Sequence, residues 1–174
     1  MTAGSPELGG AAPSCRARTG RAFHVTAAIG GQVFAIPIGR VQNVFPLSAL
    51  TPVPLAPPDV LGLMNLRGRF VTALDIRARL GLPHAAPAPG ALAIGVEAGP
   101  DSFGVLVDRI GDVVELGPET RRDVPVTPDE RWSGLSRAVH QVGPLLVIEV
   151  DVDEMLGLSA ARSGGVSPPL GGLS

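Results

Sequence analysis

Apolar residues alternate with polar or small ones in the first patterned stretch of the chain. They occupy every second position from Phe23 to Ile29, which is the period of a β-strand with one buried face. Gly30-Gly31 then indicates a hairpin turn, and the chain returns as an apolar run over 33–38. Pro37 lacks a backbone N–H, so it must lie at an edge, a bulge or a strand end. The pattern therefore predicts a first hairpin over about 23–38.

The next stretch is dominated by proline. Five prolines between Pro46 and Pro58 leave little room for a helix and predict an extended loop that leads into an apolar segment over 62–66. A sharp turn is expected at 67–69, followed by a strand over 70–74 that is buried on both faces. Asp75 is expected to N-cap a short helix that Gly81 and Pro83 close.

The second half of the chain repeats the alternation of strands and turns. Strands are predicted over 92–96 and 103–107 around a turn at 99–101, and again over 110–116. A loop over 118–132 precedes a last hairpin, with strands over 135–142 and 145–150. Asp151 with Glu154 is typical of a capping box, which predicts a short C-terminal helix.

Nine or ten short strands are more than a single five-stranded barrel can hold, so the pattern predicts an all-β fold of two small barrels or a sandwich. The composition agrees, because 45% of the 174 residues are hydrophobic and 23 Gly and 18 Pro imply many turns. A Pro/Ala linker at 83–90 is the expected seam between the barrels. Residues 1–20 and 159–174 are rich in Gly, Pro, Ser and Ala without apolar periodicity, and are predicted to be disordered tails.

Charge and composition argue against two classes of partner. The net charge is -2, the 14 basic residues are all Arg, and aromatic residues make up only 3% with no Tyr, so the chain lacks the basic groove and stacking platforms of a nucleic-acid binder. The alternative that the double barrel binds nucleic acid is therefore disfavoured. No apolar stretch approaches the roughly 20 residues that span a bilayer, and we expect a soluble cytoplasmic protein with no membrane insertion.

No arrangement of residues predicts catalysis. The chain has no phosphate-binding loop, no zinc-protease helix and no nucleophile elbow, so a hydrolase is the least favoured reading. The carboxylates near Arg109 are expected at a solvated strand edge. The remaining residues with possible chemistry lie too far apart in sequence to predict a metal or cofactor site: His24, His84, His140 and the single cysteine, Cys15. Binding is the better class.

A specific motif lies in the segment 62–77, Gly-Leu-Met-Asn-Leu-Arg-Gly-Arg-Phe-Val-Thr-Ala-Leu-Asp-Ile-Arg. It resembles the signature of the CheW family, an Asn-Leu-Arg-Gly turn followed by an apolar strand and Asp-Leu-Arg. Three further stretches follow in the matching order, at 34–44, 104–113 and 147–156. The resemblance covers about residues 21–158.

The resemblance implies a fold of two small five-stranded SH3-like barrels packed together, with short connecting and C-terminal helices. It also implies a non-catalytic scaffold that couples the cytoplasmic signalling tip of a chemoreceptor to the regulatory domain of a CheA-type histidine kinase. Such a protein needs no cofactor and is recruited from the cytoplasm to membrane-associated receptor arrays. The receptor tip is expected in the groove between the barrels and the kinase at the end of one barrel.

Carried over position by position, the receptor groove includes seven residues: Val41, Asn43, Asn65, Arg67, Gly68, Ile110 and Val113. For Val41, Ile110 and Val113, simple barrel core is an equally good reading. Arg67 is the strongest candidate, because a guanidinium suits bidentate recognition of a carboxylate.

Two positions depart from the family pattern. Many members carry Glu where this chain has Asn43, and there the Glu pairs with the arginine that corresponds to Arg67. We expect Asn43 to accept a hydrogen bond from Arg67 instead. Thr72-Ala73 replaces a Pro and a bulkier apolar residue near the kinase-facing surface. An alternative is therefore a divergent accessory adaptor of a non-flagellar system, which binds the kinase but not the usual receptor.

Overall fold

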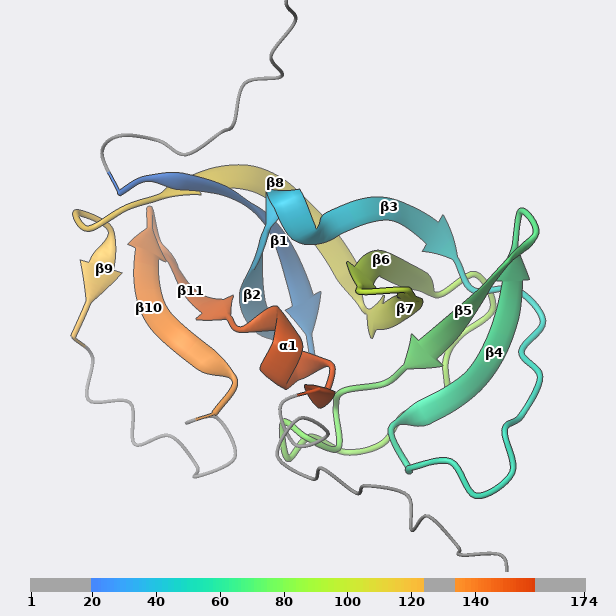
Figure 1. Ribbon diagram of the computed structural model, residues 1–174. Helices are drawn as coiled ribbons and strands as arrows, with labels where there is room; N and C mark the ends of the chain where they lie inside the picture. Colours follow the sequence, from blue (N-terminus) through green and yellow to red (C-terminus); the bar gives the residue numbers. More distant parts are fainter. Residues whose placement is uncertain (1–19, 124–133, 159–174) are drawn as a thin grey trace, which may run out of the picture.

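The computed structural model describes residues 20–123 and 134–158, which form two β-sheets joined by short connections (Figure 1). The first sheet has the order β8-β1-β2-β11-β10-β9 and the second β3-β6-β7-β5-β4. The strands of the first sheet are β1 (Ala22–Ile29), β2 (Gln32–Pro37), β8 (Arg109–Leu116), β9 (Arg121–Arg122), β10 (Ser136–Val142) and β11 (Leu145–Val150). Those of the second are β3 (Val41–Pro46), β4 (Val60–Leu66), β5 (Arg69–Leu74), β6 (Leu92–Ala98) and β7 (Asp101–Val107). The predicted all-β fold class is confirmed. The expected tails and most of the expected loop at 118–132 lie outside the described residues.

Four hairpins with two-residue turns build most of these sheets. The β1–β2 turn is made by Gly30 and Gly31, whose φ angles of 58° and 82° lie in the left-handed region that such turns require. The hairpins β4–β5, β6–β7 and β10–β11 also turn on two residues; both have a positive φ in the β4–β5 turn, and only the glycine does in the Gly-Pro turns of the other two. Pro37 ends β2, where its missing N–H costs no ladder hydrogen bond. The predicted turns at Gly30-Gly31, 67–69 and 99–101 and the predicted last hairpin over 135–150 are confirmed.

The chain crosses between the sheets at two places, and neither is the predicted seam. The first crossing is the 3₁₀ turn η1 (Ile38–Arg40) between β2 and β3, and the second is Asp108 between β7 and β8. The linker at 83–90 instead joins β5 to β6, which belong to the same sheet. The prediction of a seam at 83–90 is therefore wrong, because the first sheet is completed by strands from both ends of the chain. Parallel pairing of β2 with β11 joins the strands from the two ends of the chain into this one sheet.

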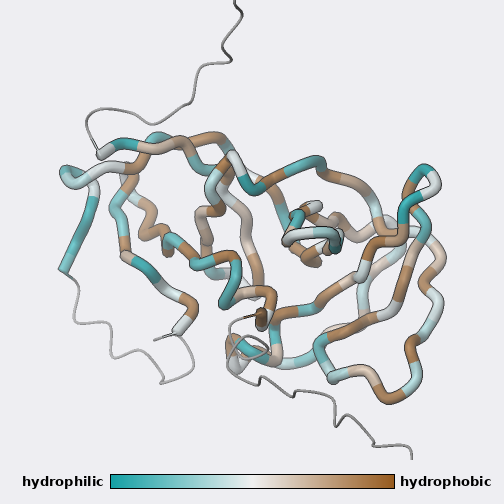
Figure 2. Tube along the Cα trace, in the orientation of Figure 1, coloured by the Kyte–Doolittle hydropathy of each residue, from teal (hydrophilic) through white to brown (hydrophobic). Residues whose placement is uncertain are grey.

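The largest apolar core lies where the two sheets pack together. Phe34 and Ile36 from the first sheet meet Ile94 and Val105 from the second, and all four are at most 2% exposed. Smaller cores fill each sheet's own interior, around Ala35 in the first and around Phe45, Met64 and Val71 in the second. Figure 2 shows apolar residues along the strands of both sheets. Burial between the sheets ties them into one unit.

The C-terminal helix α1 (Val152–Met155) adds to the same core. Asp151 caps it, since its side chain accepts hydrogen bonds from the N–H groups of Asp153 and Glu154. Val152 and Met155 are buried against the central core. The predicted C-terminal helix and its cap are confirmed.

Two local predictions are wrong, and one strand was not predicted. The segment after Asp75 forms turns rather than a helix. The Leu82 N–H donates a hydrogen bond to the Arg77 carbonyl at 2.9 Å, and this bond ends the helical hydrogen bonding after one turn. Strand β5 is not buried on both faces throughout, since Phe70 is 72% exposed. Strand β3 was not predicted, because its residues alternate weakly and its pairing partner, β6, lies about 50 residues further along the chain.

An ion-pair network fastens the sheets at the second crossing. Arg77, with its side chain 9% exposed, pairs with Asp75 at 3.3 Å and also with Asp108. Asp108 in turn accepts a hydrogen bond from the Gly30 N–H in the β1–β2 turn at 2.7 Å. The network thus links the end of β5 in the second sheet to a turn of the first sheet.

No helix in the described ranges is long and apolar enough to cross a bilayer. Within residues 20–123 and 134–158, no three His, Cys, Asp or Glu side chains group in a way that could hold a metal ion.

Candidate functional site

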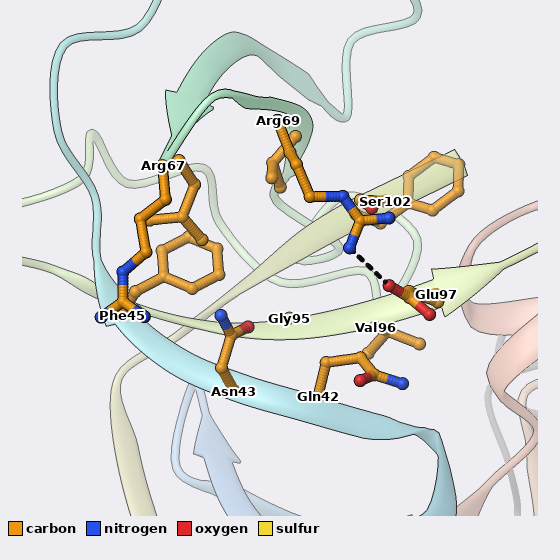
Figure 3. A pocket seen from close by; sticks show the side chains of 12 residues that line it. Gln42, Asn43, Phe45, Arg67, Arg69, Gly95, Val96, Glu97 and Ser102 are labelled. Carbon is orange, nitrogen blue, oxygen red and sulfur yellow. Dashed lines mark hydrogen bonds and ion pairs between the residues drawn. The ribbon is translucent and has the colours of Figure 1, made fainter. Parts of the chain in front are cut away.

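A cleft with a volume of about 210 Å³ lies on the second sheet, between β3, the start of β7 and the β4–β5 turn (Figure 3). Its floor is apolar and its rim is polar, an arrangement suited to recognising part of another molecule. The lining residues are Gln42, Asn43, Phe45, Leu66, Arg67, Arg69, Val71, Gly95, Val96, Glu97, Ser102 and Phe103.

The β4–β5 turn holds Arg67 at the mouth of this cleft. Arg67 and Gly68 are the two turn residues, with φ angles of 54° and 84°. The Asn65 side chain fixes the turn, since its Oδ1 accepts a hydrogen bond from the Gly68 N–H at 2.7 Å. The left-handed conformation costs a non-glycine residue about 1 kcal/mol, and Asn or Gly would occupy it more readily. Such backbone strain is characteristic of functional positions.

The charges on the cleft are not balanced. Arg69 Nη1 lies 3.1 Å from Glu97 Oε1, which neutralises that pair. In the described part of the chain, Arg67 makes neither an ion pair nor a hydrogen bond with its side chain, and the expected bond to Asn43 is not formed. The reason is the position of Asn43, whose Oδ1 is turned toward Gly95, so closely that a Cβ there would collide with it. The prediction of an Asn43–Arg67 hydrogen bond is therefore wrong.

The seven residues predicted from the family resemblance do not form one surface. Asn43, Asn65, Arg67 and Gly68 gather at the cleft and its turn. The three apolar residues lie elsewhere. Val41 and Ile110 pack against the central core, and Val113 is 54% exposed on β8, at one edge of the first sheet.

Several cleft residues were missed by the sequence reasoning. Arg69 is the last residue of the predicted turn at 67–69 and could have been included on that ground. Glu97 and Phe103 come to the cleft only because β6 pairs with β3 and β7 pairs with β5. Those pairings are non-local, and no sequence pattern indicated them.

A second polar cluster lies inside the first sheet. The rings of His24 and His140, only 3% and 4% exposed, flank the Glu149 carboxylate, with Nε2–oxygen distances of 3.6 and 3.1 Å. His140 Nδ1 lies 2.8 Å from the Thr120 hydroxyl, which donates its own proton to the Gly117 carbonyl. His140 Nδ1 is therefore a donor. The interaction with His24, and after it that with His140, lowers the pKa of the Glu149 carboxyl, although burial raises it.

This cluster predicts a pH dependence of stability. Because the pKa of Glu149 is lower in the folded state, its ionised form adds stability above its unfolded value of 4.5, and the gain is lost as the pH falls through the folded-state pKa. We expect Glu149→Gln to cost roughly 1–2 kcal/mol near pH 6, and the cost to shrink below about pH 4. Urea unfolding of both proteins from pH 6 to 3 measures it.

The matched control is Glu97→Gln, which removes a carboxylate that is 38% exposed. It should change the free energy of unfolding little at any of these pH values. A cost of Glu149→Gln that stays constant down to pH 3 would contradict the role given to the cluster.

Comparison with known proteins decides the family. A family model for the CheW-like domain matches residues 24–160, which is most of the chain. The chain belongs to the CheW-like domain family. The chemotaxis protein CheW of Rhizobium meliloti is 35% identical over 130 residues, which cover 73% of this chain and 82% of that protein. The chemotaxis protein CheW of Bacillus subtilis is 27% identical over 137 residues, covering 78% and 86%.

The fold agrees with that of a solved CheW structure. The scaffolding protein CheW from Thermoanaerobacter tengcongensis superposes with a TM-score of 0.65 at 20% sequence identity, over 75% of this chain and 88% of that one. The two packed sheets of this CheW-like chain thus correspond to a pair of SH3-like barrels, as expected. The two-residue strand β9 makes the first sheet six-stranded.

Proposed function

We propose that the protein is a chemotaxis coupling scaffold that links a chemoreceptor to a CheA-type histidine kinase. Its membership of the CheW-like family and its curated relatives, which carry the name chemotaxis protein CheW, support this function. Binding, rather than catalysis, is its activity, and its place is the cytoplasmic face of receptor arrays. None of these comparisons favours the alternative of an accessory adaptor that lacks receptor binding.

The receptor contact is assigned to the cleft around Arg67. The observation that carries this assignment is a guanidinium without an ion partner among the described residues, held over an apolar floor by a strained turn. Arginine beside apolar surface is typical of the residues that dominate protein interfaces. Val113, exposed on β8 in the first sheet, lies apart from this cleft and is proposed as a separate receptor contact, whereas Val41 and Ile110 pack against the core.

A reconstitution assay tests the coupling role. Receptor-containing membranes and the kinase are mixed with and without the full-length protein, and kinase autophosphorylation is followed. We expect activation only when all three components are present. Activation that does not depend on the protein would contradict the proposal.

The kinase contact is assigned to the second barrel, the one formed by the second sheet (β3–β7). The two most exposed large hydrophobic residues described, Leu55 at 104% and Phe70 at 72%, lie in its loop and on β5, and Val44 and Val53 add to its exposed apolar area. Exposed apolar side chains of this size mark interaction surfaces when several belong to one region. We therefore place the regulatory domain of the kinase on this barrel.

Phe70→Asp tests that placement. Removing an exposed aromatic anchor should weaken binding of the kinase regulatory domain by about tenfold or more, without lowering the melting temperature, because the side chain contributes little to the core. Calorimetric titration measures the affinity. Leu145→Asp, at a residue 52% exposed on the other sheet, is the matched control and should bind as the wild type does. If both variants lost the same affinity for the kinase domain, or if neither lost any, the kinase would bind elsewhere.

A further inference from the structure

The cleft on the second sheet carries one positive charge that the described residues leave uncompensated. Its three charged side chains are Arg67, Arg69 and Glu97, and the last two neutralise each other at 3.1 Å. A guanidinium that a partner protein covers loses its hydration, and burial of an unpaired charge is costly. A partner that seats over the cleft must therefore bring an acceptor, and an anionic one compensates the charge as well.

The shape of the cleft restricts what that acceptor can be. Asn43 lies flat over Gly95, in a space that only a residue without a Cβ leaves open. With Oδ1 turned toward Gly95, the Asn43 amide nitrogen lies on the side of Arg67, as Figure 3 shows. The amide and the guanidinium thus present N–H donors to the same space. Phe45 and Val71 supply the apolar floor beside them.

We propose that this cleft binds a carboxylate, the side chain of an Asp or Glu on the receptor segment, through Arg67 and the Asn43 amide. A planar carboxylate fits the fork of a guanidinium and leaves an oxygen lone pair for the amide. A backbone carbonyl would satisfy the donors but not the charge. The inference rests on the proposed receptor-binding function and names the chemistry by which that site recognises its partner.

A substitution at position 43 can introduce an intramolecular competitor for this carboxylate. Asn43→Glu places an intramolecular carboxylate beside Arg67, which then has its own ion partner and repels an incoming acid. Asn43→Gln has the same length and shape as Glu but no charge, and it keeps the amide donors. The two variants therefore differ in the charge at position 43 and in its amide donors, the two features that the proposal concerns. Position 43 is exposed, and thermal unfolding of both variants verifies that each is folded.

The test is calorimetric titration of both full-length variants with a receptor signalling-tip fragment. We expect Asn43→Glu to bind at least about tenfold more weakly than Asn43→Gln, with a gap that narrows as salt is added. Equal affinities of the two variants would overturn the proposal, while leaving receptor binding itself intact.

A second measurement keeps the inference testable if the tip fragment does not bind at all, a result that would count against the proposed function. Sodium acetate is titrated into the ¹⁵N-labelled protein, and the Arg67 Nε–H resonance is followed. A saturable shift in Asn43→Gln that is absent from Asn43→Glu supports carboxylate binding. No shift in either variant, or the same shift in both, would overturn it.

Discussion

Arg67→Glu is expected to weaken binding of the receptor signalling tip by at least about thirtyfold, which corresponds to about 2 kcal/mol. The substitution replaces the unpaired cation of the cleft by an anion, so a favourable contact becomes a repulsive one. Stability should not fall, since the side chain is exposed and has no ion partner in the described part of the chain. Calorimetric titration and thermal unfolding of the same preparation measure both quantities.

Arg67→Asn separates binding from the turn. Asn adopts the left-handed conformation more readily than Arg, so this variant should be at least as stable as the wild type. It should nevertheless lose receptor affinity, because the cation is gone. Wild-type affinity in either variant would show that Arg67 is only a turn residue.

Arg77→Met is expected to lower the free energy of unfolding by about 3–5 kcal/mol. Arg77 compensates Asp75, which is only 2% exposed, and ties it to Asp108 and the β1–β2 turn. Without the guanidinium, the Asp75 carboxylate stays buried beside an apolar chain. Its Oδ2 has no hydrogen-bond partner among the described residues, and the only other group left to pair with it there is the exposed His84 ring, 3.7 Å away. Urea unfolding at neutral pH measures the loss.

Arg69→Met is the matched control for that variant. Its ion pair with Glu97 is exposed, with 70% of the Arg69 side chain open to solvent, and an exposed pair contributes less than about 1 kcal/mol. If both arginine variants lost the same stability, the network at Arg77 would not be what fastens the two sheets.

The hairpins of this fold could be predicted from sequence because each depends on adjacent residues. Gly30-Gly31 and the turn at 99–101 mark reversals of the chain whatever the rest of the sequence does. The Asn-Leu-Arg-Gly motif likewise carried Asn65, Arg67 and Gly68 to the correct turn. Local backbone chemistry thus determined four of the predicted elements.

Pairings between distant segments could not be predicted. Whether β5 adjoins β6 or β7 is decided by the burial of whole sheet faces, and the misplaced seam at 83–90 followed from treating chain order as spatial order. The same limit applies to the sites. His24 and Glu149 meet only because β1 and β11 share the neighbour β2, and Glu97 joins the cleft only through β6.

The most direct test of the coupling role is calorimetric titration of the full-length protein with two partners in turn, the regulatory domain of the kinase and the receptor signalling tip. We expect saturable binding of each, and binding of the second partner when the first is already present, because a coupling scaffold must hold both partners at once. Failure to bind the receptor tip would contradict the coupling role even if the kinase domain bound, and failure to bind either would leave only the family and the fold.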